Sequence, residues 1–363
     1  MITPPLILAI DTSCDDTSAA VVWGQVVLSN VVASQTQLHK QYGGVFPTVA
    51  KQAHRENIEP VIQLALSRAE VTTAELSAIA VTQGPGLAPA LEVGIEHAKN
   101  LASQLSIPLI PVNHIEGHVL SVLAVPKKVG ASKEQLRQQA VEVNRKIEEL
   151  ELPVLSIIVS GGHTEFVLVK KPGEYQRLGF TVDDAAGEAL DKVGRMLDLG
   201  YPAGPVIEQF AKLGDATMYS FPLPMTTSGN ANLSFSGMKT AARNLLETER
   251  LKKELSAQQV YDFCASFQKA VFKAITYKLS KILLITPCFG VWLGGGVAAN
   301  MALRATLRQT IKPHQLKLQV PYTKKMCADN AAMIGVVASF KFQRGEEVSK
   351  FQTIERIPRW ELD

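Results

Sequence analysis

Apolar runs separated by tight polar turns predict two β-hairpins far apart in the chain. Residues 6–23, "LILAIDTSCDDTSAAVVW", and residues 154–170, "VLSIIVSGGHTEFVLVK", each contain an apolar strand, a turn and a second apolar strand. Small hydroxyl residues or glycines occupy both turns. The hairpins start about 150 residues apart, which indicates two related lobes rather than the short repeats of a solenoid.

Helical patterns follow each hairpin. Apolar residues recur at helical spacing in residues 50–68 and 256–284. Strand, turn and helix follow one another in residues 75–105, 108–123 and 290–311. This order predicts an α/β fold with a ligand cleft between two lobes. We expect residues 1–113 with 325–363 to form the N-terminal lobe, and residues 114–324 to form the C-terminal lobe.

The C-terminal lobe is expected to include a charged helical insertion at residues 126–151, between the lobes. This segment is rich in charged residues and glutamine, and its apolar residues fall at helical spacing. Two interpretations remain open, a solvated helix with one packed stripe or a helix that binds a partner.

Composition narrows the class of protein without naming a partner. The 363 residues are 46% hydrophobic and 20% charged, which is a globular balance. A net charge of +3 argues neither for nor against nucleic acid. The four cysteines form no CxxC pair, no apolar stretch reaches the length of a membrane span, and Asp11 interrupts the N-terminal apolar run. We therefore expect a soluble cytoplasmic protein with no membrane association.

Two glycine turns are candidate ligand-binding elements. Consecutive glycines in "IVSGGH", residues 158–163, let backbone N–H groups approach an anion. Residues 294–296 place three glycines between a strand and a helix, which suits a phosphate, sugar or base. Either turn could be only a turn, but we expect them on opposite lobes, where they favour nucleotide binding. Neither fits the P-loop or the Rossmann pattern.

Three carboxylates are a further candidate ligand surface. If a helix begins at Asp184, then Asp184, Glu188 and Asp191 share one face. The face is either solvated or turned towards hydroxyl groups of a ligand.

The motif "NHIEGH" places His114 and His118 one helical turn apart, a spacing that suits one metal ion. The zinc-peptidase motif HExxH has the same histidine spacing but carries its general base directly after the first histidine. Here the glutamate is Glu116, about 200° around the helix from His114. Asp329, in "MCADNAAMIG", is a candidate third ligand, although it could instead be a helix N-cap. Spacing alone leaves open whether these histidines bind metal or belong to the core or surface.

The ordered motifs resemble those of the TsaD family of tRNA threonylcarbamoyladenosine transferases, in its bacterial-type branch. The resemblance extends from about residue 6 to residue 345 and is carried by "AIDTSCDDT", "YGGVFPTVAKQAH", "GPGLAPALEVG", "NHIEGH", "VSGGHT", "DDAAGEALDK", "YPAGP", "LSFSGMKTA", "GGGVAAN" and "CADNAAMIG".

The resemblance implies a duplicated actin/Hsp70/sugar-kinase (ASKHA) fold and a transfer reaction. A threonylcarbamoyl group would pass from threonylcarbamoyl-adenylate to the exocyclic amine of adenosine 37, in tRNAs that read codons beginning with A. It also implies a TsaB-like paralogue and a TsaE-like ATPase as partners. His114, His118 and Asp329 would bind one divalent metal ion, iron or zinc. The substrate-binding positions would be Ile158, Val159, Ser160, Gly161, Gly162, Asp191, Gly204 and Asn300. Less specific site candidates are Asp11, Ser13 and Glu188. Of these, Asp11 is the candidate catalytic residue.

Several positions depart from the family pattern. They include Lys51 and Ala298 where serine is common, Ala203 where glycine is common, and Pro89 and Glu92 in an otherwise apolar helix. A metallopeptidase and a non-catalytic nucleotide-binding scaffold are the alternative functions. The first lacks a base in the right place, and the His, His, Asp set argues against the second.

Overall fold

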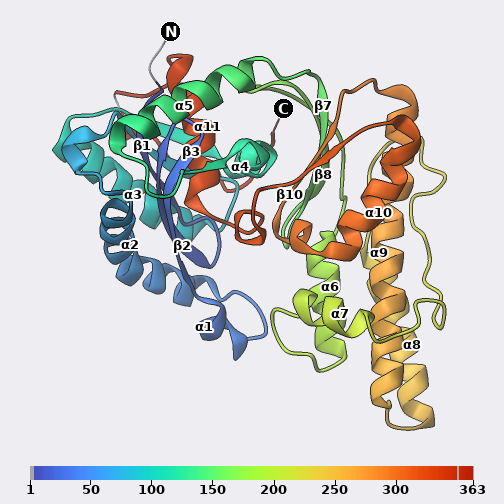
Figure 1. Cartoon of the computed structure of the whole chain (residues 1–363). Helices are drawn as coiled ribbons and strands as arrows, with labels where there is room; N and C mark the ends of the chain where they lie inside the picture. Colours follow the sequence, from blue (N-terminus) through green and yellow to red (C-terminus); the bar gives the residue numbers. More distant parts are fainter. Residues whose placement is uncertain (1–3, 350, 363) are drawn as a thin grey trace. The chain divides into compact units, whose positions relative to one another are not determined.

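The computed structural model describes residues 4–349 and 351–362, which form two compact units (Figure 1). The described residues within Met1–Glu151, Lys171–Tyr175 and Pro321–Asp363 form unit 1. Those within Leu152–Lys170 and Gln176–Val320 form unit 2. Each unit is an α/β structure with its own sheet.

The sheet of unit 1 has the strand order β5-β4-β1-β2-β3-β6. The pairs β1–β2 and β2–β3 are antiparallel, whereas β4 runs parallel to β1 and β5 runs parallel to β4. The strands are β1 (Leu6–Asp11), β2 (Asp16–Trp23), β3 (Val26–Ser34), β4 (Ala78–Gly84), β5 (Leu109–Asn113) and β6 (Val125–Pro126). The helices are α1 (Thr36–Lys40), α2 (Pro47–Ala69), α3 (Ala88–Leu105), α4 (His114–Leu120), α5 (Lys133–Glu148) and α11 (Ala331–Gln343).

The second sheet repeats this topology in the order β11-β10-β7-β8-β9. Counted from the first strand of each unit, both sheets have the order 5-4-1-2-3, so the predicted duplication is confirmed. The strands are β7 (Val154–Val159), β8 (Thr164–Lys171), β9 (Glu174–Phe180), β10 (Val291–Gly294) and β11 (Leu318–Gln319). The helices are α6 (Ala186–Met196), α7 (Gly204–Ala211), α8 (Ser236–Lys252), α9 (Ala257–Ile285) and α10 (Met301–Ile311).

Helices cover both faces of the unit 1 sheet, which explains the uninterrupted apolar run of β1. Leu8 and Ile10 belong to the apolar core that α2 and α3 help to form. Ala9 lies on the other face, close to Gly335 of α11. Strands buried on both faces read as continuous rather than alternating apolar sequence.

The unit boundary differs from the expected division after residue 113. Residues 114–151 belong to unit 1, because α4 packs on α11 and α5 packs on β2 and β3. Leu136 and Ala140 of α5 are buried in the unit 1 core, and Val143 packs against it. The packed-stripe interpretation of the insertion is therefore confirmed, but its position between the lobes is not.

Lys51 and Glu92, which the sequence analysis noted as departures from the pattern of the family it resembles, contact each other. The Lys51 ammonium of α2 lies 2.8 Å from a carboxylate oxygen of Glu92 on α3, and Arg356 lies 3.1 Å from the other oxygen. Lys51 and Glu92 thus form one surface ion pair between neighbouring helices.

None of the described helices is both long and apolar enough to span a membrane. The four cysteines are all free thiols.

Close packing of α11 on the sheet gives a direct stability prediction. A Cβ atom added at Gly335 would lie 2.7 Å and 2.9 Å from the two Cγ atoms of Val22. Overpacking of this kind costs about 1–3 kcal/mol, so Gly335→Ala should lower the midpoint of thermal unfolding measured by circular dichroism. The control is Gly237→Ala in α8, where an added Cβ has no neighbour within 4 Å. That substitution should be neutral or slightly stabilising, and equal losses in both variants would contradict the packing argument.

Candidate metal centre and ligand-binding turns

Helix α4 begins at the first histidine of the motif because Asn113 caps it. Asn113 is the last residue of β5, and its Oδ1 accepts hydrogen bonds from the N–H groups of Ile115 at 2.8 Å and Glu116 at 3.3 Å. A capping side chain satisfies N–H groups that lack partners inside the helix. The cap fixes the first turn of α4 and thereby the two buried imidazoles of His114 and His118.

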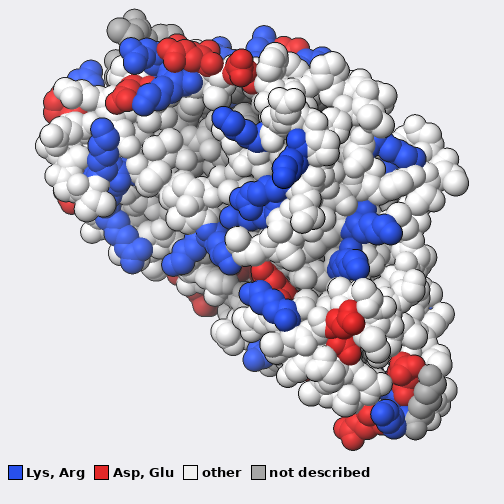
Figure 2. Space-filling view, turned by 45° about the vertical axis from the view of Figure 1, so that its right-hand side comes forward, with Lys and Arg blue, Asp and Glu red and all other residues white. Residues whose placement is uncertain are grey.

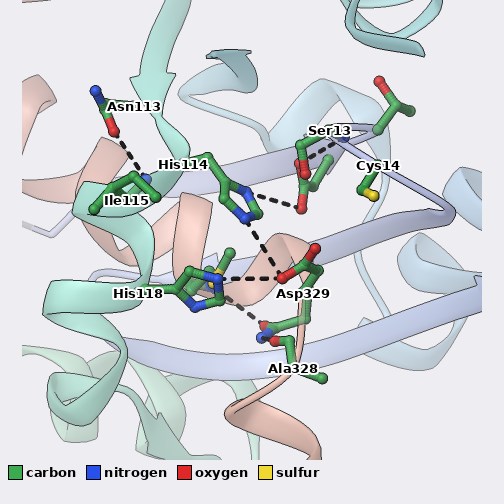
Figure 3. A network of polar contacts seen from close by, with 12 residues as sticks. Ser13, Cys14, Asn113, His114, Ile115, His118, Ala328 and Asp329 are labelled. Atoms are coloured by element: carbon green, nitrogen blue, oxygen red, sulfur yellow. Dashed lines mark hydrogen bonds and ion pairs between the residues drawn. The ribbon is translucent and has the colours of Figure 1, made fainter. Parts of the chain in front are cut away.

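Asp329 does not cap α11, contrary to the alternative that the sequence left open. The N-cap is Asn330, whose Oδ1 accepts the N–H of Met333 at 3.2 Å. The Asp329 carboxylate instead reaches α4 (Figure 3), with its Oδ1 3.4 Å from His114 Nε2 and 3.1 Å from His118 Nε2. The structure therefore brings together residues that are about 210 positions apart in sequence.

The three side chains fit a divalent metal ion. One ligand atom from each residue lies within 4.8 Å of the others. Ligands about 2.1 Å from one ion lie roughly 3.0–3.4 Å apart at octahedral or tetrahedral angles. The distances from Asp329 Oδ1 to the two histidine nitrogens, 3.4 Å and 3.1 Å, match this range. His118 Nδ1 is buried without a hydrogen-bond partner, and Asp329 is the carboxylate that His118 Nε2 contacts. The Asp329 side chain keeps 28% of its surface exposed, so the cluster is open on one side, as catalytic metal sites are.

Asp11 lies against the opposite edge of His114. Its Oδ2 is 3.6 Å from His114 Nδ1, and its Oδ1 accepts the N–H of Ser13 at 3.1 Å. Burial would lower the pKa of His114, but the carboxylates of Asp329 and Asp11 outweigh burial and raise it to about 10. Burial, with the neighbouring His114 charge, lowers the pKa of His118. Without a metal ion, the two carboxylates therefore favour the positively charged imidazolium form of His114. A metal ion bound to this ring would displace one of its two N–H protons.

Glu116 has no access to the metal cluster as a base. It is buried, and its Oε1 accepts a hydrogen bond from the Tyr175 hydroxyl at 2.8 Å. Tyr175 belongs to the Lys171–Tyr175 segment of unit 1, and its hydroxyl also accepts the N–H of Gly173. This arrangement agrees with the sequence argument against a metallopeptidase.

The turn between β1 and β2 adds acidic side chains that the sequence analysis did not single out. Burial raises the pKa of Asp16 to about 7, and the nearby Asp15, Asp329 and Asp11 add to the effect. Burial also raises the pKa of Asp15, again with a contribution from Asp329. The sequence "DTSCDD" shows that aspartates cluster in this segment, but the fold determines that they lie near Asp329.

The predicted glycine turns both lie in unit 2, not on opposite lobes. Ile158 and Val159 end β7, and Ser160, Gly161 and Gly162 form the turn to β8. Gly294 ends β10, which pairs in parallel with β7 and places Gly294 beside Ile158. The carboxyl ends of neighbouring parallel strands are the usual ligand site of open α/β sheets. The two turns therefore belong to one edge of one sheet.

The remaining predicted binding residues, Asp191, Gly204 and Asn300, also belong to unit 2, where each takes part in hydrogen bonds within the protein. Asp191 Oδ1 accepts the N–H groups of Ala203 and Gly204, each at 2.8 Å. Asn300 caps α10, and its Nδ2 donates to Gln268 Oε1 at 2.8 Å. Asp191 and Asn300 thus shape the backbone around the turns whether or not they also contact a ligand.

The proposed acidic face of α6 is offset by lysines. Helix α6 begins at Ala186 rather than Asp184. Lys192 contacts both Asp184 and Glu188 at 2.8 Å, and Lys239 of α8 also binds the Asp184 carboxylate. Asp184 therefore lies before the helix rather than on the predicted helical face, and lysines of α6 and α8 pair with Asp184 and Glu188.

This ion-pair cluster predicts a pH-dependent contribution to stability. Burial opposes ionisation of Asp184, but Lys192 and Lys239 outweigh burial and lower its pKa. A lowered pKa stabilises the fold above the unfolded value of about 4, and the contribution is lost as the pH falls below it. Asp184→Asn should cost roughly 0.5–1 kcal/mol at pH 7, and the difference from the wild type should narrow between pH 5 and pH 3.

Thermal unfolding at each pH measures this effect. The control is Asp198→Asn. The Asp198 side chain pairs with Arg250 but is 86% exposed. A pH-independent loss in Asp184→Asn would contradict the electrostatic explanation.

Solved structures with low sequence identity share the fold. HypF from T. kodakarensis aligns with a TM-score of 0.59 at 14% identity, over 96% of this chain and 50% of that chain. The activator of the 2-hydroxyisocaproyl-CoA dehydratase from Clostridium difficile aligns with a TM-score of 0.53 at 11% identity, over 94% and 96%. These likenesses and the duplicated sheets confirm the predicted ASKHA-type fold.

Sequence comparison identifies the family. The family model of TsaD, tRNA N6-adenosine threonylcarbamoyltransferase, matches residues 26–131 and 137–336. Proteins described as tRNA N6-adenosine threonylcarbamoyltransferase include one from Streptococcus mutans, 43% identical over 340 residues and 93% of each chain. Another, from Geotalea uraniireducens, is 41% identical over 359 residues, 99% of this chain and 97% of the relative. The chain therefore belongs to the TsaD family of tRNA N6-adenosine threonylcarbamoyltransferases.

Proposed function

We propose that this protein transfers a threonylcarbamoyl group from threonylcarbamoyl-adenylate to the exocyclic amine of adenosine 37 in tRNAs that read codons beginning with A. The observation that carries the proposal is the convergence of His114, His118 and Asp329 in a chain of this family. The acceptor amine forms a bond to the carbamoyl carbon, the bond from that carbon to the phosphate oxygen breaks, and AMP leaves with its electron pair. The amine loses one proton.

Binding and orientation are the main tasks of the protein, because the donor is already an activated mixed anhydride. The turn of Ser160, Gly161 and Gly162 presents backbone to the donor without Cβ atoms at its two glycines, where an added Cβ would meet no neighbour within 4 Å. The turn after β10 lies at the same edge of the sheet. These elements suit the phosphate and ribose of the adenylate.

His114, His118 and Asp329 would hold one divalent ion, iron or zinc, in unit 1. Such an ion supplies Lewis acidity to a phosphate or carbamoyl oxygen. Asp11 is only 1% exposed and lies behind His114. We therefore assign it a positioning role, in which its carboxylate keeps the His114 ring oriented with Nε2 towards Asp329.

The surface charge is compatible with an RNA substrate. On the face drawn in Figure 2, lysine and arginine side chains are more prominent than acidic ones, although the net charge of the whole chain is only +3. The proposal places the protein in the cytoplasm, with a TsaB-like paralogue and a TsaE-like ATPase as partners.

Metal binding gives a test that does not depend on activity. The wild type should retain one iron or zinc ion per chain after dialysis, whereas His118→Ala and Asp329→Asn should bind it at least roughly 100-fold more weakly, because each loses a direct ligand. Metal analysis and competition with a chelator measure the difference. His97→Ala, which removes a histidine paired with Glu59 on α2, is the control and should keep the wild-type affinity. Unchanged affinity in the ligand variants would refute the site.

Reconstitution tests the reaction. The protein, the two partner subunits, threonylcarbamoyl-adenylate and tRNA should yield threonylcarbamoyladenosine, detected by mass spectrometry of tRNA nucleosides. His114→Ala should abolish the product while adenine-nucleotide binding persists, which separates catalysis from a scaffold role. Failure of the wild type alongside a successful relative would refute the proposal. Chelator-sensitive cleavage of casein would instead favour a peptidase.

A further inference from the structure

The turn that joins α1 to α2, residues 41–46, carries two neighbouring aromatic rings on the surface of unit 1. Tyr42 and Phe46 are stacked, with ring centroids 5.1 Å apart and an angle of 22° between the planes. Their exposed fractions are 50% and 48%. Single exposed apolar side chains are ordinary, but an adjacent pair that is already stacked indicates an interaction surface. We call Tyr42 and Phe46 the aromatic pair.

Buried contacts fix the backbone that presents the aromatic pair. His39 is fully buried, and its Nδ1 accepts the N–H of Phe46 at 3.3 Å. Its Nε2 lies 3.1 Å from Gln35 Oε1, and its carbonyl accepts the N–H of Tyr42 at 3.0 Å. One imidazole ring and its backbone therefore hold both ends of the turn. Rings held in this way lose little conformational entropy when a ligand stacks on them.

The aromatic pair belongs to the same unit as the metal cluster and is connected to it through the β1–β2 turn. The carbonyl of Asp15 in that turn accepts the N–H of Gln35 at 3.0 Å, and the Gln35 side chain contacts His39. His54 of α2 contacts the carbonyl of Cys14 at 3.0 Å and the hydroxyl of Thr17 at 2.8 Å. These contacts tie the start of α2 to the turn that borders the metal cluster.

Flat exposed rings suit a nucleic-acid base better than a peptide side chain. Peptide anchors need a pocket that surrounds them, whereas an unpaired base stacks on an open aromatic face. The proposed reaction acts on a base, which must leave its stack to be reached. Lys40, the last residue of α1, is exposed and lies two residues from Tyr42, where it can meet a phosphate.

We propose that Tyr42 and Phe46 form a stacking platform for unpaired bases of the tRNA anticodon loop near the target adenosine. This inference rests on the proposed tRNA substrate and adds a location for the RNA on unit 1. Stacking tolerates different bases because every base has a π face. The platform would therefore contribute affinity for the loop, while the codon class would be selected elsewhere.

The test uses the full chain with its partner subunits and a fluorescently labelled anticodon stem-loop of a substrate tRNA. Tyr42→Ala and Phe46→Ala should each weaken RNA binding by at least roughly fivefold, measured by fluorescence anisotropy. The slope of log affinity against log salt should not change, because stacking releases no counterions. Lys40→Ala should reduce that slope by about 1.

Matched variants separate stacking from a general loss of structure. Tyr42→Phe and Phe46→Tyr retain a ring and should bind RNA as the wild type does. Phe289→Ala removes another exposed aromatic ring, in unit 2, and should have no effect on RNA affinity. In tRNA modification assays, the alanine variants of the aromatic pair should raise KM for tRNA while leaving kcat and metal content close to the wild-type values.

Three outcomes would overturn the platform. The first is unchanged RNA affinity in Tyr42→Ala and Phe46→Ala when the wild type binds and modifies tRNA. The second is an altered oligomeric state or lost binding of a partner subunit at unchanged RNA affinity, which would make the turn a protein interface. The third is equal weakening by Phe46→Tyr and Phe46→Ala. A wild type that binds the stem-loop but forms no product would refute the proposed reaction and leave the platform standing.

Discussion

The close approach of α11 to the sheet and to α4 determines the geometry of the candidate metal centre. Gly335 lets α11 lie against β1 and β2, since a Cβ there would clash with Val22. Gly117 does the same for α4, where an added Cβ would lie 3.1 Å from side-chain atoms of Ile334 and Met333. Asp329 directly precedes the capping residue of α11, and both histidines lie on α4. Packing of the two helices therefore sets the distance between the carboxylate and the imidazoles.

Burying these groups is costly unless they neutralise one another. His114 contacts two carboxylates, Asp329 and Asp11, and the acidic residues of the β1–β2 turn lie nearby. The cluster therefore has more negative than positive charge around one protonated imidazole. A divalent cation would relieve this imbalance, which gives the site a physical preference for a metal ion beyond its geometry.

The candidate ligand-binding turns of unit 2 are brought together by strand topology rather than by helix packing. Its two glycine turns follow neighbouring parallel strands, so topology alone brings backbone N–H groups from separate parts of the chain to one edge. Asp191 and Asn300 hold the backbone of the adjoining segments. The same strand order thus supports a candidate metal cluster in unit 1 and glycine turns in unit 2. Because the strand order is shared, the local sequence determines which kind of site each unit has.

Periodicity and turn chemistry were sufficient to predict the hairpins, the main helices and the duplicated α/β class, because these depend on local spacing of apolar residues and on glycine. The histidine pair was also visible, since its spacing is a property of one helix. Asp329 was a candidate third ligand in the sequence, but spacing alone left open whether it meets the pair, because it reaches the histidines only through the packing of α11 on α4. Asn330 rather than Asp329 caps the helix. Likewise, one of the two lysines that pair with Asp184 comes from α8, and the ring pair of Tyr42 and Phe46 depends on the buried His39. Local patterns determined which residues could do chemistry, and tertiary packing decided which of them meet, because contacts between distant segments depend on how whole elements fit together.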